Sequence, residues 1–122
     1  MGTHPINLAI RFLLELSALL TMGIWGWRQS EGWFRFILAL GIPIIAAVIW
    51  AIFAVPNDPS RSGKAPIPVL GLIRLILELV FFAIGTWMLY QMDYPLISLI
   101  FGSTAVIHYL FSYDRLRWLI QQ

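Results

Sequence analysis

Two stretches of the sequence place an arginine and a glutamate four residues apart among otherwise apolar residues. Arg11 and Glu15 form the first pair, and Arg74 and Glu78 form the second. Residues at this spacing lie on one face of an α-helix. A charge exposed at the centre of a bilayer costs at least about 2.5–3.5 kcal/mol, so each pair is expected to face the inside of a helical protein. Ionisable residues in such positions mark ion paths, substrate paths or ligand sites.

A third group of polar residues lies near the end of the chain. Thr104, His108 and Ser112 follow one another at intervals of four residues, so they share a helix face. The expected depth of His108 places it in the same layer as Arg11 and Arg74. The predicted ligand or ion-pair layer therefore consists of Arg11, Glu15, Arg74, Glu78, Thr104 and His108.

Two interpretations of this layer stay open. In the first, the Arg–Glu pairs clamp helices together and fix their register, although buried ion pairs are weak evidence for stability. In the second, Glu15 and Glu78 belong to a site that binds a ligand or an ion. His108 is either a hydrogen-bonded residue of the bundle or a proton carrier, haem ligand or metal ligand. One histidine cannot build a metal site without carboxylate help, so we predict no metal site and assign no cofactor.

The composition requires that most of the surface faces lipid or other protein. The chain has 122 residues, of which 60% are hydrophobic and 11% are charged, whereas an average soluble domain carries roughly 25% charged residues. A spanning helix needs about 20 largely apolar residues. We therefore predict an all-α fold, an integral membrane four-helix bundle that forms a single transmembrane domain over residues 1–122. The predicted spans are about residues 6–28, 33–55, 69–91 and 95–114.

The first and third spans look like copies of one another. Residues 10–16 align with residues 73–79, and Pro5 and Pro68 lie at the same offset upstream. A repeat unit of two spans inserts both copies the same way up, which gives a parallel repeat about an axis along the membrane normal. The sequence thus predicts two tandem halves, about residues 5–56 and 66–117.

Depth and orientation follow from the helix starts and the basic residues. Counted from Pro5 and Pro68 at 1.5 Å per residue, each arginine lies about 9 Å and each glutamate about 15 Å into its helix, which is near the bilayer midplane. Basic residues are more numerous on the side of the long loop and the termini, where Arg61 and Lys64 lie. The excess of positive charge predicts that both termini are cytoplasmic.

The sequence offers little to support an enzyme. It contains no cysteine, no P-loop, no Gly-rich dinucleotide turn and no HExxH motif, and no Ser/His/Asp set with room to act. The eight basic residues are scattered, so no nucleic-acid surface is expected. We predict no catalytic residue and no enzymatic activity. An enzyme that modifies lipid or quinone is the least favoured alternative.

Three stretches carry a resemblance to a known family. Residues 11–16 and 74–79 contain the Arg–Glu pairs, and residues 41–56 follow the pattern Gly-x-Pro…Ala-Ala…Trp…Phe…Pro. With these stretches the sequence is similar to the YrdB-like family of small bacterial membrane proteins, whose function is not established. The resemblance implies a multi-pass protein of four helices in the bacterial inner (cytoplasmic) membrane. It supplies no activity, cofactor or site residue, and it does not cover the fourth span.

Two functions compete at this point. The first is a small polytopic membrane protein that binds or passes a small ligand or ion at the Arg/Glu layer, with the lipid bilayer around it and a homodimer as one arrangement. The second is an accessory or assembly subunit of a larger membrane protein complex. The short connections between spans leave little outside the bilayer for recognition, so a partner would be contacted helix to helix.

Overall fold

The computed structural model describes residues 4–59 and 65–122. Arg61 and Lys64, which support the predicted orientation, lie outside the described residues. The described chain forms five α-helices and two short strands. In chain order they are α1 (Pro5–Arg28), α2 (Phe34–Ile52), β1 (Phe53–Ala54), β2 (Ile67–Pro68), α3 (Gly71–Gln91), α4 (Pro95–Phe111) and α5 (Tyr113–Gln121).

Proline residues and one side-chain cap set where two of the helices begin. Pro5 and Pro95 stand at the starts of α1 and α4, where a missing N–H breaks no helical hydrogen bond and the fixed φ suits the helix. The His4 ring accepts a hydrogen bond from the Ile6 N–H at 3.2 Å and so caps α1. Between α3 and α4 the chain reverses through Asp93, whose φ of 66° is left-handed, a conformation that aspartate tolerates better than most residues.

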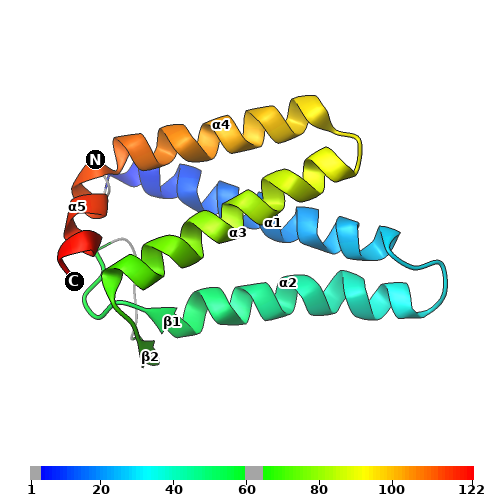
Figure 1. The fold of residues 1–122 in the computed structure, drawn as a ribbon, viewed down its shortest axis with the longest axis horizontal. Helices are drawn as coiled ribbons and strands as arrows, with labels where there is room; N and C mark the ends of the chain where they lie inside the picture. The colour runs from blue at the N-terminus through cyan, green and yellow to red at the C-terminus, as the bar shows by residue number, and fades with distance from the viewer. Residues whose placement is uncertain (1–3, 60–64) are drawn as a thin grey trace.

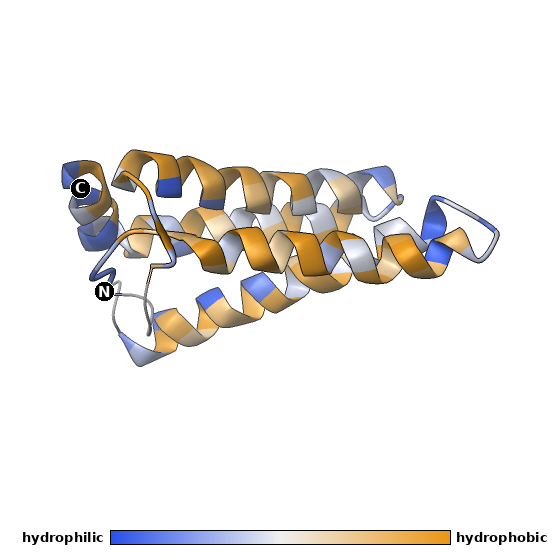
Figure 2. Cartoon of the chain, turned by 90° about the horizontal axis from the view of Figure 1, so that it is seen from below, coloured by the Kyte–Doolittle hydropathy of each residue, from blue (hydrophilic) through white to orange (hydrophobic). Residues whose placement is uncertain are grey.

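The predicted all-α class is confirmed for the described residues. α1, α2 and α3 are each long and apolar enough to cross a membrane, and α4 with α5 would make a fourth span only as a bent pair. Figure 2 shows mostly hydrophobic helices, with hydrophilic residues gathered over α5 and the connecting turns. The only strands in the described ranges are a two-residue parallel pair, with Phe53 opposite Ile67 and Ala54 opposite Pro68.

The chain bends where the sequence predicts that the fourth span continues to residue 114. α4 ends at Phe111, and α5 leaves it at an angle of 71°. The reason is the amphipathic character of α5, in which Arg115 and Leu119 are buried while Arg117 is exposed. Such a helix lies across the end of a bundle with one face inward, whereas a straight continuation would carry its charges away from their partners.

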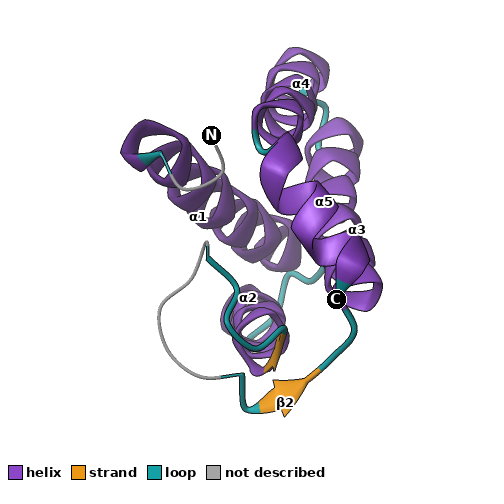
Figure 3. Cartoon of the chain, turned by 90° about the vertical axis from the view of Figure 1, so that its left-hand side faces the viewer, coloured by secondary structure: helices purple, strands orange, loops and turns teal. Residues whose placement is uncertain are grey.

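The helices do not pack equally around one core. The core joins Ala18 of α1 to Phe82 of α3 and Phe101 of α4. α2 packs chiefly against α1 and has no buried residue, and the end-on view shows it set apart from α3 and α4 (Figure 3). The contact of α1 with α2 is close because Gly26 lacks a side chain: a Cβ there would lie 2.6 Å from the Leu38 carbonyl oxygen.

One end of the molecule is built from several segments. The start of α1, the strands, the start of α3 and all of α5 lie together there (Figure 1). α5 rests on the first turn of α3 so closely that a Cβ on Gly71 would lie 1.7 Å from the carbonyl oxygen of Leu119. Only glycine permits this backbone approach. The polar residues predicted from the sequence, with the exception of Thr104, converge at this end.

Candidate functional site

Both predicted Arg–Glu pairs form within their own helices. The Nε of Arg11 lies 3.1 Å from Oε1 of Glu15 on α1, and the Nε of Arg74 lies 2.7 Å from Oε2 of Glu78 on α3. The four-residue spacing brings each guanidinium over its carboxylate along one helix face. The two helices then place Arg11 beside the second pair, because its Nη2 lies 3.0 Å from Oε2 of Glu78.

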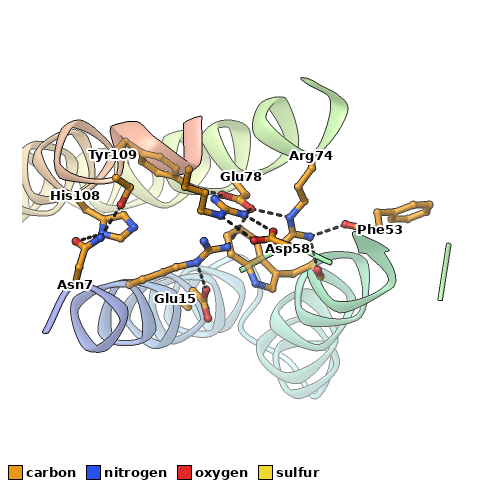
Figure 4. A network of polar contacts seen from close by, with 12 residues as sticks. Asn7, Glu15, Phe53, Asp58, Arg74, Glu78, His108 and Tyr109 are labelled. Carbon is orange, nitrogen blue, oxygen red and sulfur yellow. Dashed lines mark hydrogen bonds and ion pairs between the residues drawn. The ribbon is translucent and has the colours of Figure 1, made fainter. Parts of the chain in front are cut away.

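Glu78 is the centre of the resulting polar network (Figure 4). Its side chain is fully buried. Besides Arg11 and Arg74, it accepts hydrogen bonds from the Tyr109 hydroxyl at 2.8 Å and from both Nη atoms of Arg115, each also at 2.8 Å. Three guanidinium groups and a phenol thus surround one carboxylate. A buried charge needs this degree of pairing and hydrogen bonding to be tolerated.

Arg115 connects Glu78 to the turn that follows β1. Its Nε and Nη2 donate to the two carboxylate oxygens of Asp58 at 3.2 and 2.7 Å. Burial by itself lowers the pKa of the Arg115 guanidinium, but the hydrogen bonds and charges of Glu78 and Asp58 outweigh burial and raise that pKa above its ordinary value. Arg115 is therefore a permanent cation that bridges two buried carboxylates, and it fastens α5 to the bundle.

Arg74 ties the network to the end of α2. Its Nη1 donates to the carbonyl oxygens of Trp50 and Phe53 at 2.5 and 2.6 Å. The last carbonyls of a helix have no partner within the helix, so a buried guanidinium is well suited to satisfy them. The Arg74 guanidinium also lies 4.5 Å from the centre of the Trp50 ring, within the range of a cation–π contact.

Glu15 differs from Glu78 in both burial and partners. Its side chain is 23% exposed, against 0% for Glu78. Within the described part of the chain, Arg11 is its one hydrogen-bonding or ion-pairing partner. Glu15 lies at the edge of the network and Glu78 at its centre (Figure 4). The second carboxylate oxygen of Glu15 makes no hydrogen bond within the described residues.

His108 forms a second, uncharged group of contacts. Its Nδ1 lies 2.9 Å from the side-chain oxygen of Asn7, and the Asn7 amide donates to the Ser112 hydroxyl at 2.7 Å. Because the Asn7 oxygen is an acceptor, the Nδ1 of His108 carries the proton in this arrangement. These buried contacts tie the start of α1 to the end of α4. They correspond to the predicted interpretation of His108 as a hydrogen-bonded residue of the bundle.

Thr104 is not part of the network. Its hydroxyl donates to the carbonyl oxygen of Ile100, one turn earlier in α4, at 2.7 Å. The four-residue series thus brings His108 and Ser112 to Asn7 but leaves Thr104 occupied within its own helix. The other predicted layer residues are brought together: Arg11, Glu15, Arg74 and Glu78 by ion pairs, and His108 beside them through Tyr109.

The network lies nearer the start of α3 than the sequence suggests. Because α3 begins at Gly71 rather than near Pro68, Glu78 is about 10 Å from its helix start instead of about 15 Å. The neighbours of Glu78 include α5, so the network lies at one end of the molecule. Among the described residues its formal charges cancel, with three cations (Arg11, Arg74, Arg115) against three carboxylates (Glu15, Glu78, Asp58).

Five residues of the site were not predicted as members of the layer. Ser112 was named in the four-residue series but not assigned to the layer, and no spacing pointed to Asn7, Asp58, Tyr109 or Arg115. Asp58 and Arg115 are 57 residues apart, and no helical spacing connects them. The polar run from Ser112 to Arg117 could have indicated a new amphipathic helix. Among the described residues, no three His, Cys, Asp or Glu side chains gather in a group that could hold a metal ion.

Comparison with known proteins places the sequence without naming a function. Residues 9–106 match the family model described as "Protein of unknown function (DUF2568)". The chain is 40% identical over 119 residues to the "Uncharacterized protein YrdB" of Bacillus subtilis (strain 168), which covers 98% of this chain and 97% of that protein. No solved structure matches. The resemblance predicted from the Arg–Glu pairs and residues 41–56 is confirmed.

Proposed function

The chain belongs to the DUF2568 family, and we propose that it is a multi-pass protein of the bacterial inner membrane with a site for a small ligand or ion at Glu15. α1, α2 and α3 would be complete spans, and α4 would cross the remaining depth while α5 lies at the cytoplasmic surface. The start of α1 and α5 lie at one end of the molecule, which supports both termini on one side. The tandem repeat is part of this proposal.

The observation that carries the proposed site is the unequal state of two equivalent carboxylates. Glu78 already accepts hydrogen bonds from four side chains and is fully buried. It has no room for a further ligand. Glu15 has one partner in the described chain and is 23% exposed. A partly exposed carboxylate at about 15 Å into a spanning helix is costly unless another group engages it.

The chemistry of Glu15 defines the class of ligand. An ionised carboxylate only accepts hydrogen bonds, so its open oxygen favours a cation, a protonated amine or a proton. Among the described residues, the formal charges of the network sum to zero when Glu15 is ionised, and Arg11 holds one oxygen of Glu15 at 3.1 Å. A ligand at the other oxygen would add positive charge beside Arg11, which favours weak and reversible binding over permanent occupancy.

Thermal unfolding of the purified protein tests this proposal. Sodium, potassium, ammonium and small primary amines would each be added to the wild type, to Glu15→Gln and to Glu31→Gln, whose carboxylate is exposed between α1 and α2. A ligand at 100 times its Kd stabilises by about 2.7 kcal/mol. We expect stabilisation of the wild type and of Glu31→Gln but not of Glu15→Gln. Equal stabilisation of all three, or of none, would refute the site.

A second function, an accessory subunit of a membrane complex, has its own support. α2 has no buried residue and packs chiefly against α1, so most of its apolar surface is available to a helix of another protein. Native gel electrophoresis of membranes solubilised in mild detergent tests this alternative. Migration with a stoichiometric partner protein would support the subunit role, and migration at the mass of the chain alone or of its homodimer would refute it.

A further inference from the structure

A long groove runs between α3 and α4. Its volume is about 1150 Å³. It extends from Leu79 to Tyr90 on α3 and from Pro95 to Leu110 on α4, and Leu116 of α5 also lines it. Tyr109, whose hydroxyl bonds Glu78, is the one member of the polar network among the lining residues. At 1.5 Å per residue, these limits correspond to about 16 Å along α3 and about 22 Å along α4. One leaflet of a bilayer contributes about 15 Å of hydrocarbon, so the groove is long enough for an acyl chain of one leaflet.

The walls of this groove are mostly apolar, and two of their polar groups are bonded within the chain. The Thr86 hydroxyl donates to the Phe82 carbonyl oxygen at 2.8 Å, and the Ser98 hydroxyl donates to the Thr86 carbonyl oxygen at 2.7 Å. The polar groups of Trp87, Tyr90 and Ser103 also line the groove. A ligand therefore finds mainly hydrocarbon contacts along the groove, which favours an apolar chain.

A cation follows the lining residue Leu116 in the sequence of α5. Tyr113 precedes Leu116 by three residues and Arg117 by four, so these side chains lie on adjoining parts of α5. Arg117 is exposed, and its guanidinium lies 5.7 Å from the centre of the Tyr113 ring. Within the described ranges, no carboxylate pairs with Arg117. An exposed guanidinium suits a phosphate group, which it can hold through two parallel hydrogen bonds.

We propose that the groove between α3 and α4 binds a glycerophospholipid, with an acyl chain along the groove and the phosphate at Arg117. The groove is longer than one leaflet of hydrocarbon, and an exposed arginine of α5 follows a lining residue in the sequence. Both observations support this occupant over a partner helix. The inference rests on the proposed membrane placement, but not on the site at Glu15. It assigns α5 a second task besides closing the network, because its outer face would hold the lipid headgroup.

Native mass spectrometry in a non-ionic detergent tests the proposal. The wild type would be titrated with phosphatidylglycerol and, separately, with diacylglycerol, which lacks the phosphate. Ala83→Phe places a ring in the groove, and Ala9→Phe is its matched control, because both alanines are exposed and Ala9 does not line the groove. We expect Ala83→Phe to weaken phosphatidylglycerol binding about tenfold, which is about 1.4 kcal/mol, and Ala9→Phe to leave it unchanged.

The headgroup part of the proposal has a separate readout. Arg117→Gln should weaken binding of phosphatidylglycerol to the level of diacylglycerol and leave diacylglycerol binding unchanged. Glu15→Gln should not alter lipid binding, which separates this result from the test of the ligand site. Equal binding by Ala83→Phe and Ala9→Phe, no preference for the phosphate, or a protein partner retained in place of lipid would each overturn the proposal.

Discussion

The two Arg–Glu pairs have the same spacing and the same ion pair within the helix, yet they reach different states. Glu78 is fully buried and held by three arginines and a tyrosine, whereas Glu15 is 23% exposed and has one partner in the described chain. The difference does not arise in the pairs themselves. It arises because Arg115 of α5, which also contacts Asp58 in the turn after β1, reaches Glu78, whereas within the described residues Arg11 is the one partner of Glu15. The shared four-residue spacing therefore determines the ion pair within each helix, but not the burial and the further partners of each glutamate.

The two glutamates are expected to differ in how much each contributes to stability and in whether each can bind a ligand. A carboxylate that compensates three buried guanidinium groups cannot be removed without leaving uncompensated charge. A carboxylate at the edge of the network, with one partner in the described chain, should cost little to neutralise. The sequence left two alternatives, a clamp and a ligand site, and we propose the clamp for Glu78 and the ligand site for Glu15.

Replacing Arg115 should have the largest effect on stability, because it takes from Glu78 a partner that Glu15 also lacks. Arg115→Ala leaves Asp58 without the guanidinium that contacts both of its oxygens and removes two hydrogen bonds from Glu78. We expect a loss of about 3–5 kcal/mol, measured as unfolding followed by tryptophan fluorescence in detergent. Arg117→Ala, an exposed arginine on the same helix, is the control. Equal stability of the two variants would contradict the account.

Gly71→Ala should separate α5 from α3 without changing any charge. The added Cβ would lie 1.7 Å from the carbonyl oxygen of Leu119, so α5 must shift. Overpacking of this kind typically costs about 1–3 kcal/mol. Hydrogen exchange should show faster exchange of the α5 amides in Gly71→Ala. In Gly32→Ala, where the Cβ meets nothing within 4 Å, exchange should stay as in the wild type. Unchanged exchange in both would show that α5 does not depend on this contact.

Tyr109→Phe sharpens the comparison by removing one donor from Glu78. The hydroxyl donates to Oε1 at 2.8 Å in a buried site, and its loss should cost about 1–2 kcal/mol because the other donors remain. Tyr113→Phe, which changes an exposed tyrosine, should cost less than about 0.5 kcal/mol. Chemical denaturation of the two variants side by side measures the difference. If they lose the same amount, the Tyr109 hydroxyl does not support Glu78.

Thr104→Val should have the smallest effect. The Thr104 hydroxyl bonds only within its own helix, to the carbonyl oxygen of Ile100, and valine has nearly the same shape. We expect a change within about 0.5 kcal/mol in thermal unfolding. A loss above about 1 kcal/mol would indicate that Thr104 belongs to the polar layer, as the sequence predicts.

The sequence predicts most of the helices and the inner part of the site because both depend on local spacing. Hydrophobic runs locate α1, α2 and α3, and the four-residue spacing locates both ion pairs. The rest depends on tertiary contacts. Arg115 reaches Glu78 across 37 residues and Asp58 across 57, so no periodic pattern joins them. The bend at Ser112 was missed because an apolar run predicts how far a helix can extend and not where it turns.

One measurement tests the central claim most directly. Glu15→Gln and Glu78→Gln make the same chemical change at equivalent positions of the two pairs, and their free energies of unfolding can be compared with that of the wild type in one detergent. We predict a loss of about 3–5 kcal/mol for Glu78→Gln, since three buried guanidinium groups lose their shared anion, and less than about 1 kcal/mol for Glu15→Gln. Equal losses, or a larger loss for Glu15→Gln, would contradict the claim that Glu78 stabilises the fold whereas Glu15 is available to a ligand.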